Sequence, residues 1–258
     1  MNKLKRCRYG TMVYPPNDIY IGRSFELYGE FSEAEVAFFR QAVKPGFTVL
    51  DVGANIGAHT VPLAQLSGRG GRVLAFEPQR IPYYCLCGNM VLNNLGNVLC
   101  YQSGAAEVEG TISVPELNYD AESNFGGLDL TREYPGSGSY SVPAVRIDGL
   151  QLKNCHFMKI DVEGMERNVL EGAVETIRAH RPILYVEDDR QEKSAALRAF
   201  LDSLGYAMHL HLPPYFNPAN LANNQQNVFG NTVSYNLFCY PKESAAPVDP
   251  AAFKMRKI

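Results

Sequence analysis

The chain contains a short apolar run that ends in an acid and leads directly into a glycine-rich turn. The run is TVLDV, residues 48–52, and the turn is GANIG, residues 53–57. A second apolar run, residues 72–76, ends in Glu77. In α/β proteins a buried strand brings such a turn to the edge of the sheet, and an acid after the next strand accepts hydrogen bonds from ribose hydroxyls. The two runs therefore predict a pocket for an adenosine-containing cofactor.

The spacing of the glycines indicates which cofactor the pocket takes. A dinucleotide site reads G-x-G-x-x-G and holds a pyrophosphate on free backbone N–H groups. Here Gly53 and Gly57 form G-x-x-x-G, and Asp51 stands two residues before the first glycine. An acid there repels pyrophosphate but suits an ammonium group. The pattern favours S-adenosylmethionine, which has a ribose, an ammonium and no phosphate; a nicotinamide-dependent oxidoreductase is the alternative.

Composition excludes several other classes of protein. With 258 residues, 46% of them hydrophobic, the chain can bury one sizeable core. The net charge is −3 and no basic cluster interleaves with aromatic residues, so we expect no nucleic-acid partner. No apolar run approaches the ~18 residues of a membrane span, and none follows the basic N-terminus as in a signal peptide. The six cysteines form no C-x-x-C pair, which favours reduced thiols in a cytoplasmic protein.

Strand-like and helix-like segments alternate, which predicts a doubly wound, largely parallel α/β sheet. Strands are expected at 47–52, 72–77, 98–103, 156–161, 183–187, 206–212 and 235–240. A capping-box pattern from Ser32 to Glu35 predicts a helix start, and further helices are expected at 56–66, 80–94, near 169–177 and at 192–204. Pro62 should delay or bend the helix at 56–66.

The order of these predicted elements divides the chain into three parts. Residues 1–46 form an N-terminal extension with its capped helix, residues 47–241 form the main domain, and 242–258 form a tail without a clear pattern. Within the domain, 111–145 is polar and rich in Gly and Pro. A loop of that length beside the expected cofactor site predicts an inserted hairpin or lid.

Three motifs together resemble the FkbM family of S-adenosylmethionine-dependent methyltransferases. They are DVGANIG at 51–57, FEP at 76–78 and MKIDVEG at 158–164. The resemblance implies a Rossmann-like class I methyltransferase fold, with seven strands of which the last is antiparallel. It also implies O-methylation of a small-molecule or glycan acceptor, commonly a sugar, a polyketide or another secondary metabolite. A non-catalytic binding protein on the same fold is the remaining alternative, and the sequence leaves the acceptor and the oligomeric state open.

On such a fold the motifs and the strand order suggest where the cofactor lies. Asp51 and Gly53 should face its methionine end, Glu77 its ribose and Pro78 its adenine. The expected cofactor-binding residues are Asp51, Gly53, Ala54, Asn55, Gly57, Glu77, Pro78, Ser103, Gly104 and Asp161.

Methylation of a sugar hydroxyl needs help, because the hydroxyl is a poor acid. Asp161 ends the fourth expected strand and Glu163 follows it; either can act as general base, with a pKa raised by neighbouring acids. Alternatively, Asp161, Glu163 and Glu187 hold a Mg²⁺-like ion that lowers the pKa of the hydroxyl. A third interpretation is purely structural: Glu163 or Glu187 caps a helix, or pairs with Lys159 or Arg190.

Histidines offer another base. His209 and His211 alternate along one expected strand and so share a face, either in the acceptor pocket or at the surface. His59, near the start of the helix that follows the glycine turn, is expected to pack or cap.

Overall fold

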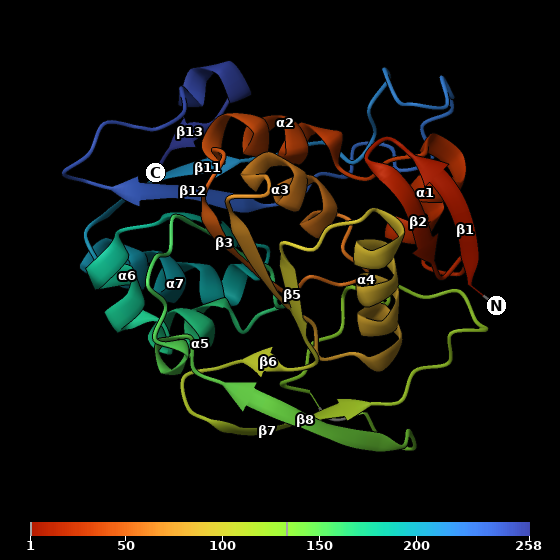
Figure 1. Ribbon diagram of the computed structural model, residues 1–258, viewed down its shortest axis with the longest axis horizontal. Coiled ribbons are helices and arrows are strands. Elements are labelled where there is room, and N and C mark those ends of the chain that lie inside the picture. Colours follow the sequence, from red (N-terminus) through yellow and green to blue (C-terminus); the bar gives the residue numbers. More distant parts are fainter. Residues whose placement is uncertain (1, 133) are drawn as a thin grey trace.

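The computed structural model describes residues 2–132 and 134–258 and has a central sheet with helices on both faces (Figure 1). The eight strands are β3 (Thr48–Val52), β4 (Arg72–Phe76), β5 (Val98–Tyr101), β9 (Phe157–Ile160), β10 (Ile183–Glu187), β11 (Tyr206–His211), β12 (Asn236–Pro241) and β13 (Arg256–Lys257). Their order is β13-β11-β12-β10-β9-β3-β4-β5. β12 runs antiparallel to both neighbours, while β10, β9, β3, β4 and β5 are parallel. The expected seven-stranded fold is confirmed, with the two-residue β13 added at one edge.

Successive residues of the central strands pack on opposite faces of the sheet, as the two-residue period of a strand requires. Leu50, Met158 and Leu184 belong to the core under α5 (Glu166–Glu171), α6 (Val174–His180) and α7 (Gln191–Ser203). Val49 and Phe157 belong to the core on the other face, under α2 (Glu33–Ala42) and α3 (Thr60–Ser67). Among the residues described, no helix has the length and apolar character needed to cross a membrane.

Two helix starts differ from the simplest sequence pattern. α3 begins at Thr60, so Pro62 lies in its first turn, where the missing N–H costs nothing. The late start inferred from Pro62 is confirmed. The helix start predicted at Ser32 is confirmed, since Ser32 is the N-cap of α2, but the capping contact itself is not formed: Ser32 has φ +42° and its side chain caps no backbone N–H. Its Oγ donates instead to Glu35 Oε1, at 2.8 Å.

The N-terminal extension folds as a hairpin, β1 (Lys3–Cys7) and β2 (Gly10–Tyr14), followed by α1 (Ile21–Tyr28). Two asparagines bind the backbone of β2. Asn89 lies in α4 (Arg80–Leu92), and Asn93 is the C-cap residue of that helix. Asn89 pairs with the N–H and C=O of Val13, and Asn93 does the same with Thr11. These paired amide contacts attach the extension to the main domain.

The inserted stretch is partly a hairpin and partly a covering loop. β7 (Gly110–Pro115) and β8 (Ser139–Val145) pair antiparallel, and β6 (Gly104–Ala105) joins them in a small sheet below the central one in Figure 1. The chain between β7 and β8, residues 116–138, is hereafter the covering loop. It reaches the N-terminal extension, where the backbone of Ser123 bonds to Asn17 and Ile19.

The tail packs against the domain, although its sequence shows no clear pattern. A 3₁₀ turn (Pro250–Phe253) precedes β13, which pairs with β11. Val248 and Met255 are 3% and 9% exposed and belong to the core under α2. The tail is therefore held by buried apolar side chains, whose spacing in the sequence is too irregular to predict a helix or strand.

Candidate functional site

Two cavities open at the carboxyl ends of the parallel strands, where ligands of such sheets bind. The first, the apolar cavity, is lined by Val52, Phe76, Pro78, Ser103, Gly104, Ile112, Leu128, Leu130 and Met165, among others. The second, the acidic cavity, is lined among others by Tyr20, Phe31, Glu35, Asn55, His59, Lys159, Glu187, Tyr215 and Ser234. Both share Gly53, Gly126, Asp161 and Glu163. One ligand can therefore span both cavities by passing Gly53 and Asp161.

Gly53 is required by a close backbone approach. Its φ is +83°, and a Cβ there would lie 1.7 Å from the carbonyl oxygen of Asp161. Only glycine allows the turn after β3 to meet the end of β9 at this distance. Gly57 also has positive φ, but a Cβ there would meet Leu86 and Met90, so this glycine serves helix packing. Gly57 does not line either cavity, contrary to the expectation of a cofactor contact.

Asp51 differs most from its expected position. Its side chain is 0% exposed and lies beneath the turn, where Oδ2 accepts a hydrogen bond from Thr60 Oγ1 at 2.6 Å. Oδ1 is 3.7 Å from Lys159 Nζ. Burial raises the pKa of Asp51, and the Lys159 ammonium opposes this rise. The carboxylate does not line either cavity, so in this structure it supports Lys159 rather than facing a ligand.

Glu77 holds the two turns that border the cavities. It is 3% exposed; Oε2 accepts from the backbone N–H of Asn55 at 2.8 Å and Oε1 from that of Gln79 at 2.7 Å. Burial raises the pKa of Glu77 to about 7, although both N–H groups oppose the shift. Glu77 itself lines neither cavity, so a ribose contact through its remaining lone pairs stays a prediction. Pro78, next to Glu77, lines the apolar cavity.

The buried Lys159 forms an ion pair with the half-buried Asp161 at the junction of the cavities. Lys159 is 3% exposed, and its Nζ lies 2.9 Å from Asp161 Oδ2. Burial disfavours the ammonium, but the carboxylates of Asp161 and Asp51 raise the pKa of Lys159 above its usual value. Burial disfavours the Asp161 carboxylate too, yet Lys159 more than offsets this and lowers its pKa. Asp161 is therefore a fixed negative charge, and a weak base.

The three acids proposed as metal ligands do come together. Asp161, Glu163 and Glu187 each present a carboxylate oxygen, all within 4.8 Å of one another. Burial and the Asp161 charge raise the pKa of Glu163 to about 8, against the opposing Arg190, which donates a hydrogen bond to Glu163. Burial and Asp161 also raise the pKa of Glu187 well above its usual value. Lys159, Arg190 and bound protons thus already neutralise these acids, and the donor set fits a divalent ion poorly.

Several residues of the acidic cavity escape sequence reasoning. Tyr20, Phe31 and Glu35 come from the N-terminal extension, and Tyr215 and Ser234 from the loop between β11 and β12. Two of them leave a signal in the sequence: Tyr215 lies in HLPPYFNP, residues 211–218, a stretch that the sequence suggests helps to shape the acceptor site, and Glu35 is the last residue of the capping-box pattern. The capping-box pattern places Glu35 in the first turn of a helix and does not predict that its side chain is buried.

The two histidines of β11 do not reach the cavity. His211 is 3% exposed, and its Nδ1 lies 2.9 Å from the hydroxyl of Tyr185. His209 stacks on the Tyr240 ring at a centroid distance of 5.8 Å. Both therefore contribute to packing and are not candidate bases. His59 packs between Phe31 and Phe39 as expected, but it also lines the acidic cavity.

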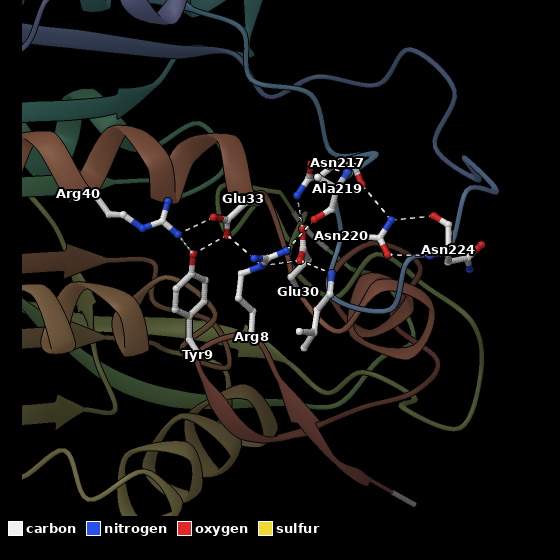
Figure 2. A network of polar contacts seen from close by, with 10 residues as sticks. Arg8, Tyr9, Glu30, Glu33, Arg40, Asn217, Ala219, Asn220 and Asn224 are labelled. Atoms are coloured by element: carbon white, nitrogen blue, oxygen red, sulfur yellow. Dashed lines mark hydrogen bonds and ion pairs between the residues drawn. The ribbon is translucent and has the colours of Figure 1, made fainter.

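A polar network joins the N-terminal extension to the β11–β12 loop (Figure 2). Its centre is Glu30, 3% exposed, whose carboxylate accepts from Arg8 Nε at 2.6 Å, Asn217 Nδ2 at 2.7 Å and the Leu221 N–H at 2.8 Å. Arg8 also donates to the Ala219 carbonyl at 2.8 Å. Two segments far apart in the sequence thereby form one wall of the acidic cavity.

Comparisons with known proteins agree with this fold. A family model described as "Methyltransferase FkbM domain" matches residues 51–208. Methyltransferase sdnD of Sordaria araneosa is 29% identical over 165 residues, which cover 49% of this chain and 60% of that protein. Methyltransferase 1 of Beauveria bassiana is 23% identical over 190 residues, which cover 66% of this chain and 76% of that protein. The chain thus spans about 60% of the length of the sdnD protein.

Two solved structures share the fold. Methyltransferase FkbM from Methylobacillus flagellatus superposes with a TM-score of 0.50 at 20% identity, covering 80% of this chain and 50% of that one. A precorrin-6y C5,15-methyltransferase from Geobacter metallireducens superposes with a TM-score of 0.52 at 12% identity, covering 80% of this chain and 87% of that one. At these identities the likeness establishes the class I methyltransferase fold alone. Because the family model matches more than half of its residues, this chain belongs to the FkbM methyltransferase family.

Proposed function

We propose that this protein transfers a methyl group from S-adenosylmethionine to a hydroxyl oxygen of a sugar or secondary metabolite. The observation that carries the proposal is the pair of cavities that meet at Gly53 and Asp161. One is apolar and suits a purine; the other is polar and suits a hydroxylated acceptor. A group transferred between two ligands must pass where their cavities join.

The residues of the apolar cavity fit the proposed cofactor. Phe76 and Pro78 offer apolar contacts for adenine, and the buried acid Glu77 lies between them in the chain, as a ribose-binding acid should. Asp161 supplies a fixed negative charge where a sulfonium and an ammonium group need one. When bound, the cofactor supplies a methyl group already activated by its positive sulfur, so the chain must align the acceptor and take up its proton.

The acidic cavity supports a hydroxylated acceptor. Tyr20, Phe31 and Tyr215 pack edge to face, with Tyr215 5.4 Å from Tyr20 and 5.6 Å from Phe31 between ring centroids. Aromatic rings offer apolar contact to the C–H faces of a sugar, and Ser234 and Asn236 offer hydrogen bonds to its hydroxyls. Most of this wall lies outside residues 51–208, so we place acceptor choice in the N-terminal extension and the β11–β12 loop.

Labelled cofactor tests the proposed function. We expect the protein, given S-adenosylmethionine with a CD₃ group and a pool of methyl glycosides and polyketide alcohols, to form S-adenosylhomocysteine and d₃-methyl ethers detectable by mass spectrometry. EDTA should leave the rate unchanged, because Lys159 and Arg190 already neutralise the acids near the junction. Loss of activity with EDTA, restored by Mg²⁺, would show that the metal interpretation is correct. Failure to bind the cofactor at all would refute the proposal.

The covering loop should open to admit the cofactor. The two cavities measure about 100 Å³ and about 50 Å³ here, below the ~300 Å³ of a typical ligand pocket. Gly126 and Leu128 of this loop border them. The loop is held where Asp18 Oδ2 accepts from the Phe125 N–H at 3.2 Å and the Phe125 carbonyl accepts from Gln79 Nε2 at 2.8 Å.

Hydrogen exchange across residues 116–138 measures this opening. We expect exchange in the free protein and slower exchange once cofactor and acceptor are bound, since a closed loop excludes water from the transfer site. The hairpin strands β7 and β8 serve as the internal control and should change little. Equal, strong protection of the covering loop with and without ligand would indicate a rigid segment instead.

A further inference from the structure

A buried carboxylate outside residues 51–208 enters the acidic cavity. Glu35 lies in the first turn of α2, is 3% exposed, and lines the cavity with Lys159, Tyr215 and Ser234. Glu33, in the same helical turn, instead pairs with Arg40 away from this cavity. The two acids thus differ in environment although they are two residues apart, and only Glu35 can meet an acceptor.

The oxygens of Glu35 have different partners. Oε1 accepts from Ser32 Oγ at 2.8 Å and from Ser234 Oγ at 2.9 Å. Oε2 lies 3.9 Å from His59 Nε2, too far for a hydrogen bond, and no other described residue donates to it. His59 Nε2 is itself buried with no hydrogen-bond partner among the described residues, and burial lowers the pKa of His59 to about 3, which keeps the ring neutral. Two unpaired polar atoms on one cavity wall are what a ligand hydroxyl satisfies.

Two of the other carboxylates of the cavity are committed to cations, and burial with the Asp161 charge raises the pKa of the third, Glu187, well above its usual value, which disfavours its charged form. Asp161 is paired with Lys159, and Glu163 with Arg190. Glu35 receives its hydrogen bonds from neutral hydroxyls only. Burial raises the pKa of Glu35 to about 7, against the opposing charge of Lys159. A general base works best with a pKa near the working pH, so Glu35 suits proton removal better than Asp161 does.

We propose that Glu35 is the general base of the reaction and that His59 Nε2 helps to position the acceptor hydroxyl beside it; this inference rests on the proposed function. The O–H bond of the acceptor breaks and its proton moves to Glu35 Oε2. The freed electron pair on oxygen forms the new O–CH₃ bond. The C–S bond of the methyl sulfonium breaks, and its electrons remain on sulfur as a neutral thioether. Glu35 then releases its proton to water.

Glu35→Gln tests the proposal, with Glu33→Gln as the matched control on the same helical turn. The probes are methyl α-D-glucopyranoside, methyl α-L-rhamnopyranoside and glycerol, with CD₃-labelled S-adenosylmethionine. The wild-type rate should rise as the pH passes about 7, where the Glu35 carboxylate forms. Glu35→Gln should cut the rate by roughly 10²–10⁴-fold and abolish this pH step, with S-adenosylhomocysteine affinity unchanged. Glu33→Gln should keep both the rate and the step. A Glu35→Gln protein that does the same would overturn the proposal.

A second measurement does not depend on finding an acceptor. In protein labelled with ¹³C at the glutamate carboxyl, the NMR signal missing from Glu35→Gln should titrate near 7. It should also shift when glycerol is added. Titration near the ordinary glutamate value of about 4.3, or no response to glycerol, would overturn the role of Glu35. Failure of the proposed function appears separately, as absence of S-adenosylhomocysteine binding by the wild-type protein.

Discussion

Replacing Lys159 by methionine is expected to lower the free energy of unfolding by about 3–5 kcal/mol, the cost of leaving a buried charge without its partner. Asp51 is 0% exposed, and Lys159 Nζ is the cation near its Oδ1, at 3.7 Å. The same ammonium holds Asp161 at 2.9 Å. Methionine has a similar length and fills the space, so the loss should report the charge rather than a cavity. Urea denaturation followed by circular dichroism measures the change.

Two further variants make this test specific. Lys242→Met removes an exposed lysine paired with Asp202, and should change stability by at most about 1 kcal/mol. The double variant Lys159→Met with Asp51→Asn should recover part of the loss, because the buried carboxylate that needs a cation is gone. If Lys159→Met behaves like Lys242→Met, or if the double variant is as unstable as the sum of the single ones, the buried ion pair does not support the fold.

Glu77→Ala is expected to weaken S-adenosylmethionine binding by about 1.5–3 kcal/mol, the scale of hydrogen bonds to a charged group. Besides the proposed ribose contact, the change removes the acceptor for the N–H groups of Asn55 and Gln79, at 2.8 and 2.7 Å. Both turns border the cavities, so their loosening adds to the loss. Isothermal titration calorimetry with the cofactor measures it.

The control for this variant is Glu171→Ala, which removes a partly exposed acid that is paired with Arg167 and lines neither cavity, and which should leave cofactor affinity unchanged. Glu77→Gln separates the two contributions, since the amide keeps one oxygen acceptor but loses the charge. NADH should give no measurable heat with the wild-type protein. Unchanged affinity in Glu77→Ala would remove the ribose assignment, and NADH binding would contradict the choice of cofactor.

Sequence patterns of short range predict the scaffold well. Alternating apolar runs place the strands and helices of the main domain, and Pro62 indicates the late start of α3. The covering loop and its hairpin are predicted from polar and glycine-rich composition. The capping contact between Ser32 and Glu35 is predicted less well. The two residues have the spacing of a capping box, yet their side chains bond to each other. Glu35 points inward because Ser234, far away in the sequence, donates a second hydrogen bond to it.

Candidate site residues divide in the same way. Pro78, Ser103 and Gly104 line the apolar cavity, as their places at strand ends predict. Asp51, Gly57 and Glu77 do not line either cavity, because a motif gives the order of residues along the chain but not the direction in which each side chain points. Asp51 turns toward Thr60 and Lys159, where a buried carboxylate finds a donor and a cation.

The sequence alone determined the doubly wound sheet, the glycine turn at its edge and the family to which the chain belongs. All three depend on residues close together in the chain, whose spacing records strand period, turn geometry and motif. The tertiary structure decided the acidic cavity, the burial of Asp51 and the meeting of Glu35 with Ser234. Those contacts join residues far apart in the sequence, where local spacing carries no information, and they form because buried polar groups must find partners once the sheet and helices have packed.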